Sequence, residues 1–567
     1  MAIIGIDLGT TNSLACTWQN GRCVIIPNRF GKELTPSAVS IDEDGTLYIG
    51  AIAKERLITH PDDSIALFKR TMGSNQTYTL QGKQYTSEEL SSFVIRQLVD
   101  DAKAYLQEEI EEAIISVPAY FNDAQRSATK QAGALAGIKV ERLINEPSAA
   151  ALFARSNQDE ECFLIFDFGG GTLDISIVEC FEQIISILAV SGDNHLGGSD
   201  FDRAIADAFC EENDLFFEDL SPQEERMLLR QCEEMKITLS QKEEVTNQIT
   251  FKERIYSFTL SSRKLIMRAP DLFERLLTPI HKALHDAGRT PHDLDQIIMV
   301  GGSSKMPTVK SYLEMKLERT ILNHNECERI VAMGIGMYAG IKQRAQDIKD
   351  LILTDICPFT LGINIHNESD PNNPYMHAII ERNSPLPSSV EHNFYTIHDD
   401  QKAVDIKIFQ GESMYANHNL LLGKTEVKVK QGKAGEYPIK VRFTYDINGI
   451  LDVDILDTGS QNKETLLITP AHTTMSEAEI EKARKALEKL KFHPREEDQN
   501  KLILSRLERL FEESTMEQRE YIITLHKQFE AVLEKQDRIQ IEVYRKKFEA
   551  IVDTLERELH PYQPTYH

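Results

Sequence analysis

Two short segments of the chain place an aspartate and a glycine-containing turn directly after a run of apolar residues. In the first segment, Asp7 ends the apolar run and Leu8-Gly9-Thr10-Thr11-Asn12 forms the turn. In the second, Asp167 ends the run, and Phe168-Gly169-Gly170-Gly171-Thr172 leads to a further aspartate, Asp174. Glycines allow several backbone N–H groups to face one anion. Aspartates alone would repel a phosphate, so the combination predicts Mg²⁺, held through water between a phosphate and the carboxylates of Asp7, Asp167 and Asp174.

The elements around these residues are predicted to be β-hairpins, because each turn joins two short apolar segments. For one segment alone, an ordinary hairpin with a flexible turn is the alternative. The pattern recurs 160 residues later, which predicts that roughly the first 345 residues form two related halves. Two facing hairpins would clamp a polyphosphate from opposite sides. A third segment, Gly301-Gly302-Ser303 after apolar residues 297–300, would bring the backbone close to a flat ligand such as a nucleobase.

Composition limits the classes of function. The chain has 567 residues, which predicts three or four structural units, and 41% of the residues are hydrophobic, enough for packed cores. The formal net charge of −26 argues against binding to nucleic acid or to an anionic membrane. No signal peptide and no run of membrane-spanning length is apparent, so a cytoplasmic location is expected. The eight cysteines form no C-x-x-C pair and are expected to be small buried hydrophobic residues.

Five motifs carry a resemblance to a known family. They are residues 6–12 (IDLGTTN), 117–126 (VPAYFNDAQR), 145–147 (NEP), 167–172 (DFGGGT) and 192–198 (GDNHLGG). In this order they resemble the DnaK-type heat shock 70 kDa chaperone family, and the length and short surface loops are most similar to its HscC-like branch. The resemblance implies a multidomain fold. An α/β actin-like ATPase domain of two similar lobes is expected over residues 1–347, a linker over 348–355, a β-sandwich substrate-binding domain over 356–470 and an α-helical lid over 471–567.

The resemblance assigns roles in ATP hydrolysis to residues that are ambiguous by themselves. Lys69 is assigned to the γ-phosphate and the attacking water, although a lysine is usually a solvated surface charge. Glu146 is assigned to the hydration shell of the metal and to sensing of the γ-phosphate, although a glutamate at a helix start is often only favourable dipole chemistry. Thr172 and Asp174 complete the implied catalytic set.

The implied nucleotide site draws on segments throughout the first domain. Glu233, Lys236 and Ser240 fall on one face of a predicted helix, which alone would be an ordinary polar face, and the resemblance assigns them to ribose and adenine. Lys305 stands where an arginine commonly stacks on adenine, which predicts weaker nucleotide binding because an ammonium group cannot stack as a plane. The expected nucleotide-binding residues are Gly9, Thr10, Thr11, Asn12, Gly169, Gly170, Gly171, Thr172, Gly197, Gly198, Glu233, Lys236, Ser240, Gly301, Gly302 and Ser303.

Other residues are implied in communication between the domains. Pro118 and Arg126 are implied as part of a relay from the nucleotide to the substrate domain, with a plain strand end as the alternative for Pro118. Arg142 and Asp355 are candidate contacts for a J-domain co-chaperone. All four roles come from the resemblance.

The segment Asp350-Leu-Ile-Leu-Thr-Asp355 matches the interdomain linker of the family. By resemblance, Leu351, Leu353 and Asp355 belong to an element that packs on the ATPase domain in only one nucleotide state. Thr354 replaces an apolar residue of the usual pattern. Because its hydroxyl must find a hydrogen-bond partner on docking, the sequence predicts weaker docking than for a fully apolar linker.

From residue 356 to about 470 the sequence alternates as short strands, which predicts an all-β unit and matches the peptide-binding sandwich of the family. The expected strands cover residues 361–365, 403–409, 425–430, 439–445, 450–456 and 464–468. Alternation favours a core position for Ile408 and the substrate pocket for Val404. His366 and Ile397 occupy arch positions usually taken by Met and Ala, which leaves the substrate preference open. The expected peptide-binding residues are Ile363, His366, Phe394, Ile397, Val404 and Ile406.

The resemblance therefore predicts an ATPase that couples ATP hydrolysis to the binding and release of extended apolar polypeptides. ATP or ADP and Mg²⁺ are the expected ligands, with K⁺ as a further option. A J-domain co-chaperone and a monomeric state are expected, while the need for a nucleotide exchange factor stays open. One alternative is a small-molecule kinase on the same ATPase fold, which would not need a linker, sandwich or lid. Another is an exchange factor or holdase with weak ATPase activity, against which Lys69, Thr172 and Asp174 argue.

Overall fold

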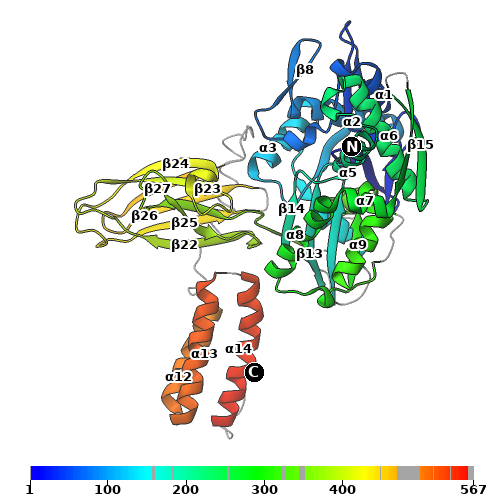
Figure 1. Cartoon of the computed structure of the whole chain (residues 1–567). Coiled ribbons are helices and arrows are strands. Elements are labelled where there is room, and N and C mark those ends of the chain that lie inside the picture. Colours follow the sequence, from blue (N-terminus) through cyan, green and yellow to red (C-terminus); the bar gives the residue numbers. More distant parts are fainter. Residues whose placement is uncertain are drawn as a thin grey trace. The chain divides into compact units, whose positions relative to one another are not determined.

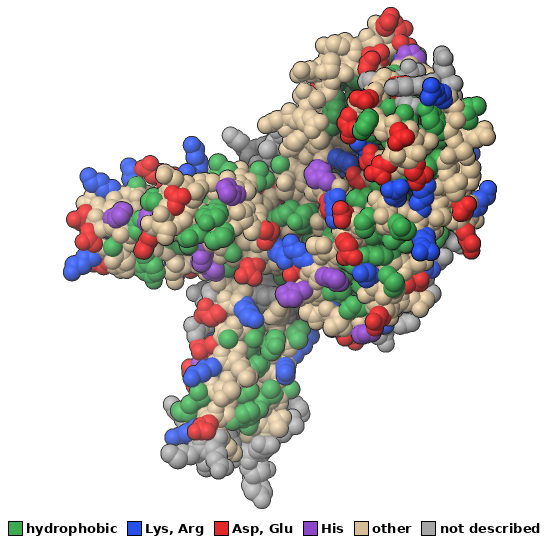
Figure 2. Space-filling view, in the orientation of Figure 1, with side chains coloured by type: hydrophobic (Ala, Val, Ile, Leu, Met, Phe, Trp, Pro, Cys, Tyr) green, Lys and Arg blue, Asp and Glu red, His purple; other side chains and the backbone are tan. Residues whose placement is uncertain are grey.

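The computed structural model describes residues 2–155, 160–181, 184–251, 254–321, 326–343, 352–446, 449–468, 498–514, 516–536 and 538–559. Contacts group them into two compact units, of which the first ends at Thr354 and the second begins at Asp355 (Figure 1). Acidic and basic side chains are interspersed on the face drawn in Figure 2. Within the described part of the chain, no helix combines the length and the apolar character needed to cross a bilayer.

The first unit contains two sheets built on one plan. In the first sheet, β1 (Ala2–Asp7), β2 (Asn12–Gln19) and β3 (Arg22–Ile26) form an antiparallel meander. β10 (Ile110–Val117) joins β1 in parallel, and β11 (Leu143–Asn145) extends the sheet beyond β10. Hairpin connections allow the antiparallel pairs, whereas the parallel pair requires a long crossover through helices.

The second sheet repeats this plan with β12 (Glu160–Phe168), β13 (Leu173–Phe181) and β14 (Ile184–Asp193) as the meander. β17 (Gln296–Val300) joins β12 in parallel, as β10 joins β1. β18 (Ile352–Ile356) pairs through its first three residues with β14. The two related halves predicted from the repeated turn are present as this repeated strand order.

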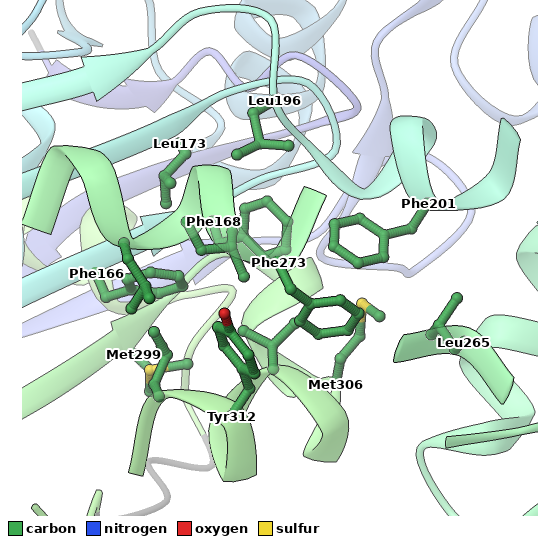
Figure 3. Packing of buried hydrophobic residues seen from close by; sticks show 14 of the residues in the cluster. Phe166, Phe168, Leu173, Leu196, Phe201, Leu265, Phe273, Met299, Met306 and Tyr312 are labelled. Atoms are coloured by element: carbon green, nitrogen blue, oxygen red, sulfur yellow. The ribbon is translucent and has the colours of Figure 1, made fainter. Parts of the chain in front are cut away.

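The helices of the first unit cover these sheets. α10 (Ile330–Lys342) lies on β1, β2 and β3 and packs against α4 (Glu146–Ala154), which contacts β12, β13 and β14. The largest hydrophobic core lies on the second sheet, where Figure 3 shows the rings of Phe168, Phe201 and Phe273 in successive edge-on contacts. The helices that complete the unit are α1 (Ala51–Thr59), α2 (Ser87–Leu106), α3 (Asp123–Leu135), α5 (Gly198–Glu212), α6 (Pro222–Leu239), α7 (Ser262–Arg268), α8 (Pro270–Asp286) and α9 (Pro307–Leu317). Its remaining strands are β4 (Thr35–Pro36), β5 (Ala38–Ile41), β6 (Leu47–Ile49), β7 (Ser64–Ala66), β8 (Thr77–Leu80), β9 (Lys83–Thr86), β15 (Glu244–Phe251) and β16 (Arg254–Ser261).

The second unit contains a β-sandwich of two four-stranded sheets. One sheet has the order β20-β19-β23-β24 and the other β22-β25-β26-β27. Apolar side chains from both inner faces form one core. The strands are β19 (Leu361–Ile365), β20 (Tyr375–Ile380), β21 (Pro385–Leu386), β22 (Ser388–Phe394), β23 (Ala403–Gln410), β24 (Leu420–Lys428), β25 (Ile439–Tyr445), β26 (Leu451–Asp457) and β27 (Asn462–Ile468).

The same unit includes a helical bundle of α12 (Asp498–Glu513), α13 (Met516–Glu534) and α14 (Arg538–Leu559). Leu507, Phe529 and Phe548 belong to its buried core. All eight cysteines of the chain are free thiols, and seven of them are buried. The prediction that they act as small buried residues is confirmed for these seven.

Candidate active site

The two glycine-containing turns lie against each other. A methyl group on Gly170 would lie 1.8 Å from Thr11 Oγ1, and one on Gly171 would lie 2.6 Å from Thr10 Cγ2. A side chain at either position therefore requires its neighbour to move, which explains the glycines at this contact. The predicted facing arrangement of the two turns is present.

Backbone hydrogen bonds hold the second turn to the start of α5. The Gly169 N–H donates to Thr172 O at 3.0 Å, and the Gly198 N–H donates to Gly169 O at 3.0 Å. The Gly197 N–H donates to Asp200 Oδ2 at 2.7 Å, which is a capping interaction at the N-terminus of α5. The turn and this helix N-terminus therefore form one local structure.

Three buried aspartates lie beside the turns. Burial, followed by repulsion from Glu146, raises the pKa of Asp7 to about 7 and that of Asp174 to about 8. Burial raises the pKa of Asp167 well above its ordinary value, and Glu146 and the other two aspartates raise it further. Lys69 lowers the pKa of all three aspartates. Because one ammonium group faces four carboxylates, the ionised cluster would be stabilised by an additional cation.

The donor set fits a hydrated divalent cation. Carboxylate oxygens are hard ligands of the kind that Mg²⁺ prefers, and Mg²⁺ usually retains several waters. The buried Asp174 Oδ1 has no hydrogen-bond partner within the described chain, while Ser116 Oγ donates to Asp7 Oδ1 at 2.8 Å. Among the residues described, no three His, Cys, Asp or Glu side chains are placed to bind one ion directly. Because Mg²⁺ usually retains waters, the three aspartates would hold it through those waters.

Lys69 forms a buried ion pair with Glu146. Its Nζ lies 3.1 Å from Glu146 Oε1, and the two side chains are 5% and 10% exposed. Lys69 belongs to a short 3-10 helix, Phe68–Thr71, and Glu146 is the first residue of α4. The ammonium group also lies 5.5 Å from the centroid of the Phe121 ring. These contacts hold the charge of Lys69 at a defined position.

Lys69 and Thr172 line one cleft of the first unit, where the space free of protein atoms, open solvent included, is about 220 Å³. The sequence predicted Thr10, Lys69, Pro118 and Thr172 as functional, and the cleft brings these four together. The lining residues are Thr10, Lys69, Arg70, Pro118, Phe121, Gln125, Thr172 and Asn194.

Arg70 is a functional candidate that sequence reasoning missed. Its Nε donates to Gly171 O at 2.9 Å, and its Nη2 donates to Ser199 Oγ at 3.1 Å and to Asp200 Oδ2 at 2.9 Å. It therefore links the Lys69 segment to the second glycine turn and to α5. The only local signal was a second basic residue beside Lys69, because its partners lie more than 100 residues further along the chain.

Arg126 connects the cleft wall to Asn145, the residue before Glu146. Its Nη2 donates to Asn145 Oδ1 at 2.6 Å, and its Nε donates to Phe121 O at 3.1 Å. Pro118 and Phe121 line the cleft, and Asn145 directly precedes Glu146. The two predicted relay residues, Pro118 and Arg126, thus both lie at this wall.

The residues predicted to contact adenosine gather beside α5. Lys236 Nζ donates to Gly198 O at 2.7 Å and lies 2.7 Å from Asp202 Oδ1. A methyl group on Gly198 would lie 2.2 Å from Ser303 Oγ, so these two residues are adjacent. Ser240 Oγ donates to Lys236 O at 3.4 Å. The ammonium group of Lys236 therefore binds Gly198 and Asp202, and its backbone carbonyl accepts the hydrogen bond from Ser240.

Two further predicted positions have charged partners. Glu233 pairs with Lys54 of α1 at 3.5 Å, which links α1 to α6. The ammonium group of Lys305 pairs with the carboxylate of Glu328. Gly301 directly precedes the 3-10 helix that contains Lys305, and its φ of 86° is a value that favours glycine. Of the remaining predicted residues, Gly9 belongs to the first turn, Asn12 begins β2 and Gly302 begins the 3-10 helix Gly302–Lys305.

The linker residues have different outcomes. Leu351 lies outside the described residues, and the backbone of Leu353 pairs with Ile185 in β14. Thr354 Oγ1 donates to Ser186 Oγ at 2.9 Å and to Ile185 O at 3.3 Å. The hydroxyl therefore has partners when β18 pairs with β14, and the expectation that it weakens docking is not supported. At the start of the second unit, Asp355 Oδ1 accepts a hydrogen bond from the Ile356 N–H at 2.9 Å.

Arg142 lies near the end of α10. Its guanidinium group is 5.1 Å from the centroid of the Tyr338 ring, within the range of a cation–π interaction. Lys342, the last residue of α10, pairs with Glu112 and with Glu141. The end of α10 is thereby tied to β10 and to the segment that contains Arg142.

The predicted peptide-binding residues divide by depth. Ile363 and Ile406 are buried in the sandwich core, as is Ile408, for which a core position was expected. Val404 and Phe394 are half-buried at the edge of this core. His366 and Ile397 are exposed. Val404 and Phe394 thus combine apolar character with partial access to solvent.

The comparison with known families agrees with this arrangement of sites. The matching family model is described as Hsp70 protein, and the match covers residues 3–564, nearly the whole chain. Members of this family are ATPases that act as chaperones, bind ATP or ADP with Mg²⁺, and bind unfolded polypeptides and J-domain proteins. The chain belongs to the Hsp70 family of ATP-dependent chaperones.

Proposed function

We propose that this chain is an HscC-like chaperone in which ATP hydrolysis by the first unit controls the binding and release of extended apolar polypeptide segments by the second. The observation that carries the proposal is the placement of Lys69 in one cleft with Thr10 and Thr172, which belong to the two glycine turns that contact each other. A second observation is the sandwich with Val404 and Phe394 half-buried at its edge.

Backbone N–H groups of the two turns would bind the ATP phosphates, as glycine-rich turns do elsewhere. Thr11 Oγ1 is buried at this contact and has no hydrogen-bond partner within the described chain, so it is available to a phosphate oxygen. Asp7, Asp167 and Asp174 would hold Mg²⁺ through its waters. When bound, Mg²⁺ would supply neutralisation of the phosphate charge.

Hydrolysis would follow from positioning and electrostatics, without a covalent intermediate on the protein. Lys69 would donate hydrogen bonds to the attacking water and to the γ-phosphate, where negative charge develops. Glu146 fixes the Lys69 ammonium group through the 3.1 Å ion pair and would thereby sense the γ-phosphate. Thr172 would orient the water from the second turn.

The sharpest test of this function combines ATP turnover with a change in the peptide site. Unfolded polypeptide should accelerate ATP turnover by the wild-type chain, with release of inorganic phosphate. Val404→Phe should largely remove this acceleration and weaken peptide affinity, because a larger ring at this half-buried position would fill the predicted substrate pocket. Leu421→Phe is the matched control, since it adds a ring at an exposed position of the neighbouring strand β24.

Phosphate transfer to a small hydroxylated compound, without acceleration by polypeptide, would instead identify a kinase. Binding of ATP without measurable single-turnover hydrolysis would identify a holdase. If peptide affinity survives Val404→Phe, the pocket lies elsewhere in the sandwich.

Coupling between the units provides a further prediction at Thr354. Thr354→Val removes the hydroxyl that bonds Ser186 and Ile185, while Thr354→Ser retains it. A hydrogen bond contributes about 0.5–1.5 kcal/mol, so the valine variant should lose about two- to tenfold of the acceleration of peptide release by ATP. Release rates of a labelled peptide with and without ATP measure this effect. An undiminished ATP effect in Thr354→Val would show that the hydroxyl contributes nothing to docking.

A further inference from the structure

Two histidines join the two sheets of the sandwich at one edge. His377 Nε2 on β20 and His392 Nδ1 on β22 lie 3.0 Å apart and form a hydrogen bond. β20 and β22 are edge strands of opposite sheets. In register, His377 lies opposite Ile363 and His392 lies opposite Val441, both of which are buried in the core. Directly paired residues share a face of the sheet, so both imidazoles are on the inner faces.

The histidine pair contacts one of the predicted peptide-binding residues. The rings of His377 and Phe394 meet edge to face, with centroids 5.1 Å apart and planes at 88°. Phe394 follows His392 by two residues on β22, so the two side chains are on the same face of the strand. The imidazole pair therefore fixes the orientation of a ring at the edge of the core.

The stability of the hydrogen bond between the two histidines depends on how many protons the pair carries. When both rings are neutral, one N–H donates across the pair and the other nitrogen accepts. One added proton places a cation beside the apolar residues of the inner faces, which is unfavourable. A second added proton removes the acceptor, and the two rings must then separate.

We infer that His377 and His392 are positioning residues for the peptide site, which hold Phe394 in place as a neutral pair and make peptide binding acid-sensitive. The inference rests on the proposed binding of peptide by the sandwich. It extends that proposal by assigning a role to two residues that lie outside the predicted set of contacts.

The charges around the pair are compatible with a neutral state. Burial lowers the pKa of both imidazoles, and the proximity of His377 lowers the pKa of His392 further. Glu381 acts in the opposite direction and raises the pKa of His392. An unfolded imidazole, with a pKa of about 6.5, takes up a proton first as the pH falls. The contribution of the neutral pair to stability is therefore present above about pH 6.5 and decreases as the pH falls through that value.

The neighbouring strands add no charge on the inner faces. β19 and β20 carry no Asp, Glu, Lys or Arg, and His377 is their single titratable imidazole. On β22 and β25, Glu391, Lys440 and Arg442 alternate with inner-face residues. Glu391 pairs with both Lys440 and Arg442, and its Oε2 lies 2.8 Å from Arg442 Nη2. Glu391 therefore pairs with both cations on the outer face, and the group of three keeps a net charge of about +1 there.

The test measures binding of a leucine-rich peptide with capped termini, no ionisable side chain and a rhodamine label, to the full chain with ADP. The dissociation constant of the wild type should rise about three- to tenfold between pH 7.5 and pH 5.5. The upper bound is set by an imidazole of ordinary pKa, about 6.5, which must be neutral in the complex. Thermal unfolding at each pH restricts the comparison to the folded protein.

Variants separate the pair from other titrating groups. The double variant His377→Gln/His392→Gln retains amide hydrogen bonding across the sheets but cannot titrate, so its affinity should change by less than about 1.5-fold. His418→Gln replaces an exposed histidine of the same unit and should retain the full wild-type change. If the double variant does not fold, calorimetry on the wild type in buffers of different ionisation enthalpy decides the matter. Peptide binding should then release protons at pH 6 and none at pH 7.5.

The outcomes distinguish this inference from the proposed function. Three results would overturn the inference and leave peptide binding in place. They are equal wild-type affinity at both pH values, a loss of affinity between pH 7.5 and pH 5.5 in the double variant as large as in the wild type, and absence of proton release at pH 6. Absence of peptide binding at pH 7.5 would overturn the proposed function, and the inference with it.

Discussion

Replacing Lys69 with alanine is expected to slow single-turnover ATP hydrolysis by about 10²–10³-fold, the size seen when one donor that stabilises developing charge is removed. Lys69 is the basic group that acts on Asp7, Asp167 and Asp174 together. Its loss removes the donor proposed to hold the attacking water. Equilibrium affinity for ATP should change much less, because backbone N–H groups and Mg²⁺ are proposed to supply most of that affinity.

The control for this experiment is Lys83→Ala, which removes an exposed lysine of the same unit. Rapid mixing of the enzyme with a stoichiometric amount of labelled ATP isolates the chemical step from product release. Hydrolysis within threefold of the wild type would remove Lys69 from the mechanism. An equal loss of hydrolysis and of ATP affinity would instead assign Lys69 to nucleotide binding.

The sequence predicted the centre of the site because its signals are local. A glycine turn between two short apolar strands can be recognised within about 20 residues, and both hairpins that contain Asp7 and Asp167 are present. Arg70 was missed for the opposite reason. Its partners on the second glycine turn and α5 are brought to it only by the packing of the two halves of the unit.

In the sandwich too, strands with a local apolar pattern were predicted, whereas strands whose inner-face residues depend on a distant partner were harder to predict. Strands over Leu361–Ile365 and Ile439–Tyr445 were predicted with the observed bounds, because their inner faces are apolar at every second position. β20 was missed, and for β22 the sequence placed Phe394 on a strand without giving its bounds. Each of the two strands has a histidine on the inner face where alternation would require an apolar residue. The hydrogen bond between His377 and His392 makes these positions compatible with burial, and a partner on another sheet cannot be read from either strand alone.

For Thr354, the presence of a hydrogen-bond partner decides whether the hydroxyl weakens or strengthens docking of the linker. A hydroxyl in an apolar linker was expected to weaken docking, because an unpaired hydroxyl is costly to bury. Ser186 supplies the missing partner from β14. The sequence contains both residues, but nothing in their separation of 168 positions indicates that they meet.

Substitution of a glycine at the contact between the two turns is the second change expected to have a large effect, in this case on ATP affinity. Gly170→Ala should weaken ATP binding about 5- to 150-fold, since overpacking of a tight contact costs about 1–3 kcal/mol. The added methyl group would lie 1.8 Å from Thr11 Oγ1, so the turns must separate or Thr11 must rotate. Either change alters the backbone groups proposed to bind the phosphates. Equilibrium titration with a fluorescent ATP analogue measures the affinity.

The neighbouring glycine offers a matched comparison. A methyl group on Gly169 would meet nothing closer than 3.7 Å, an ordinary contact, so Gly169→Ala should weaken ATP binding much less than Gly170→Ala. The double variant Gly170→Ala/Thr11→Ala lacks Thr11 Oγ1, the atom that the added methyl group would overlap. It should therefore bind ATP more tightly than Gly170→Ala alone. Such non-additivity identifies the Gly170–Thr11 contact as the origin of the loss. Equal losses for Gly169→Ala and Gly170→Ala, or additive effects in the double variant, would place the cause in crowding of the phosphate itself.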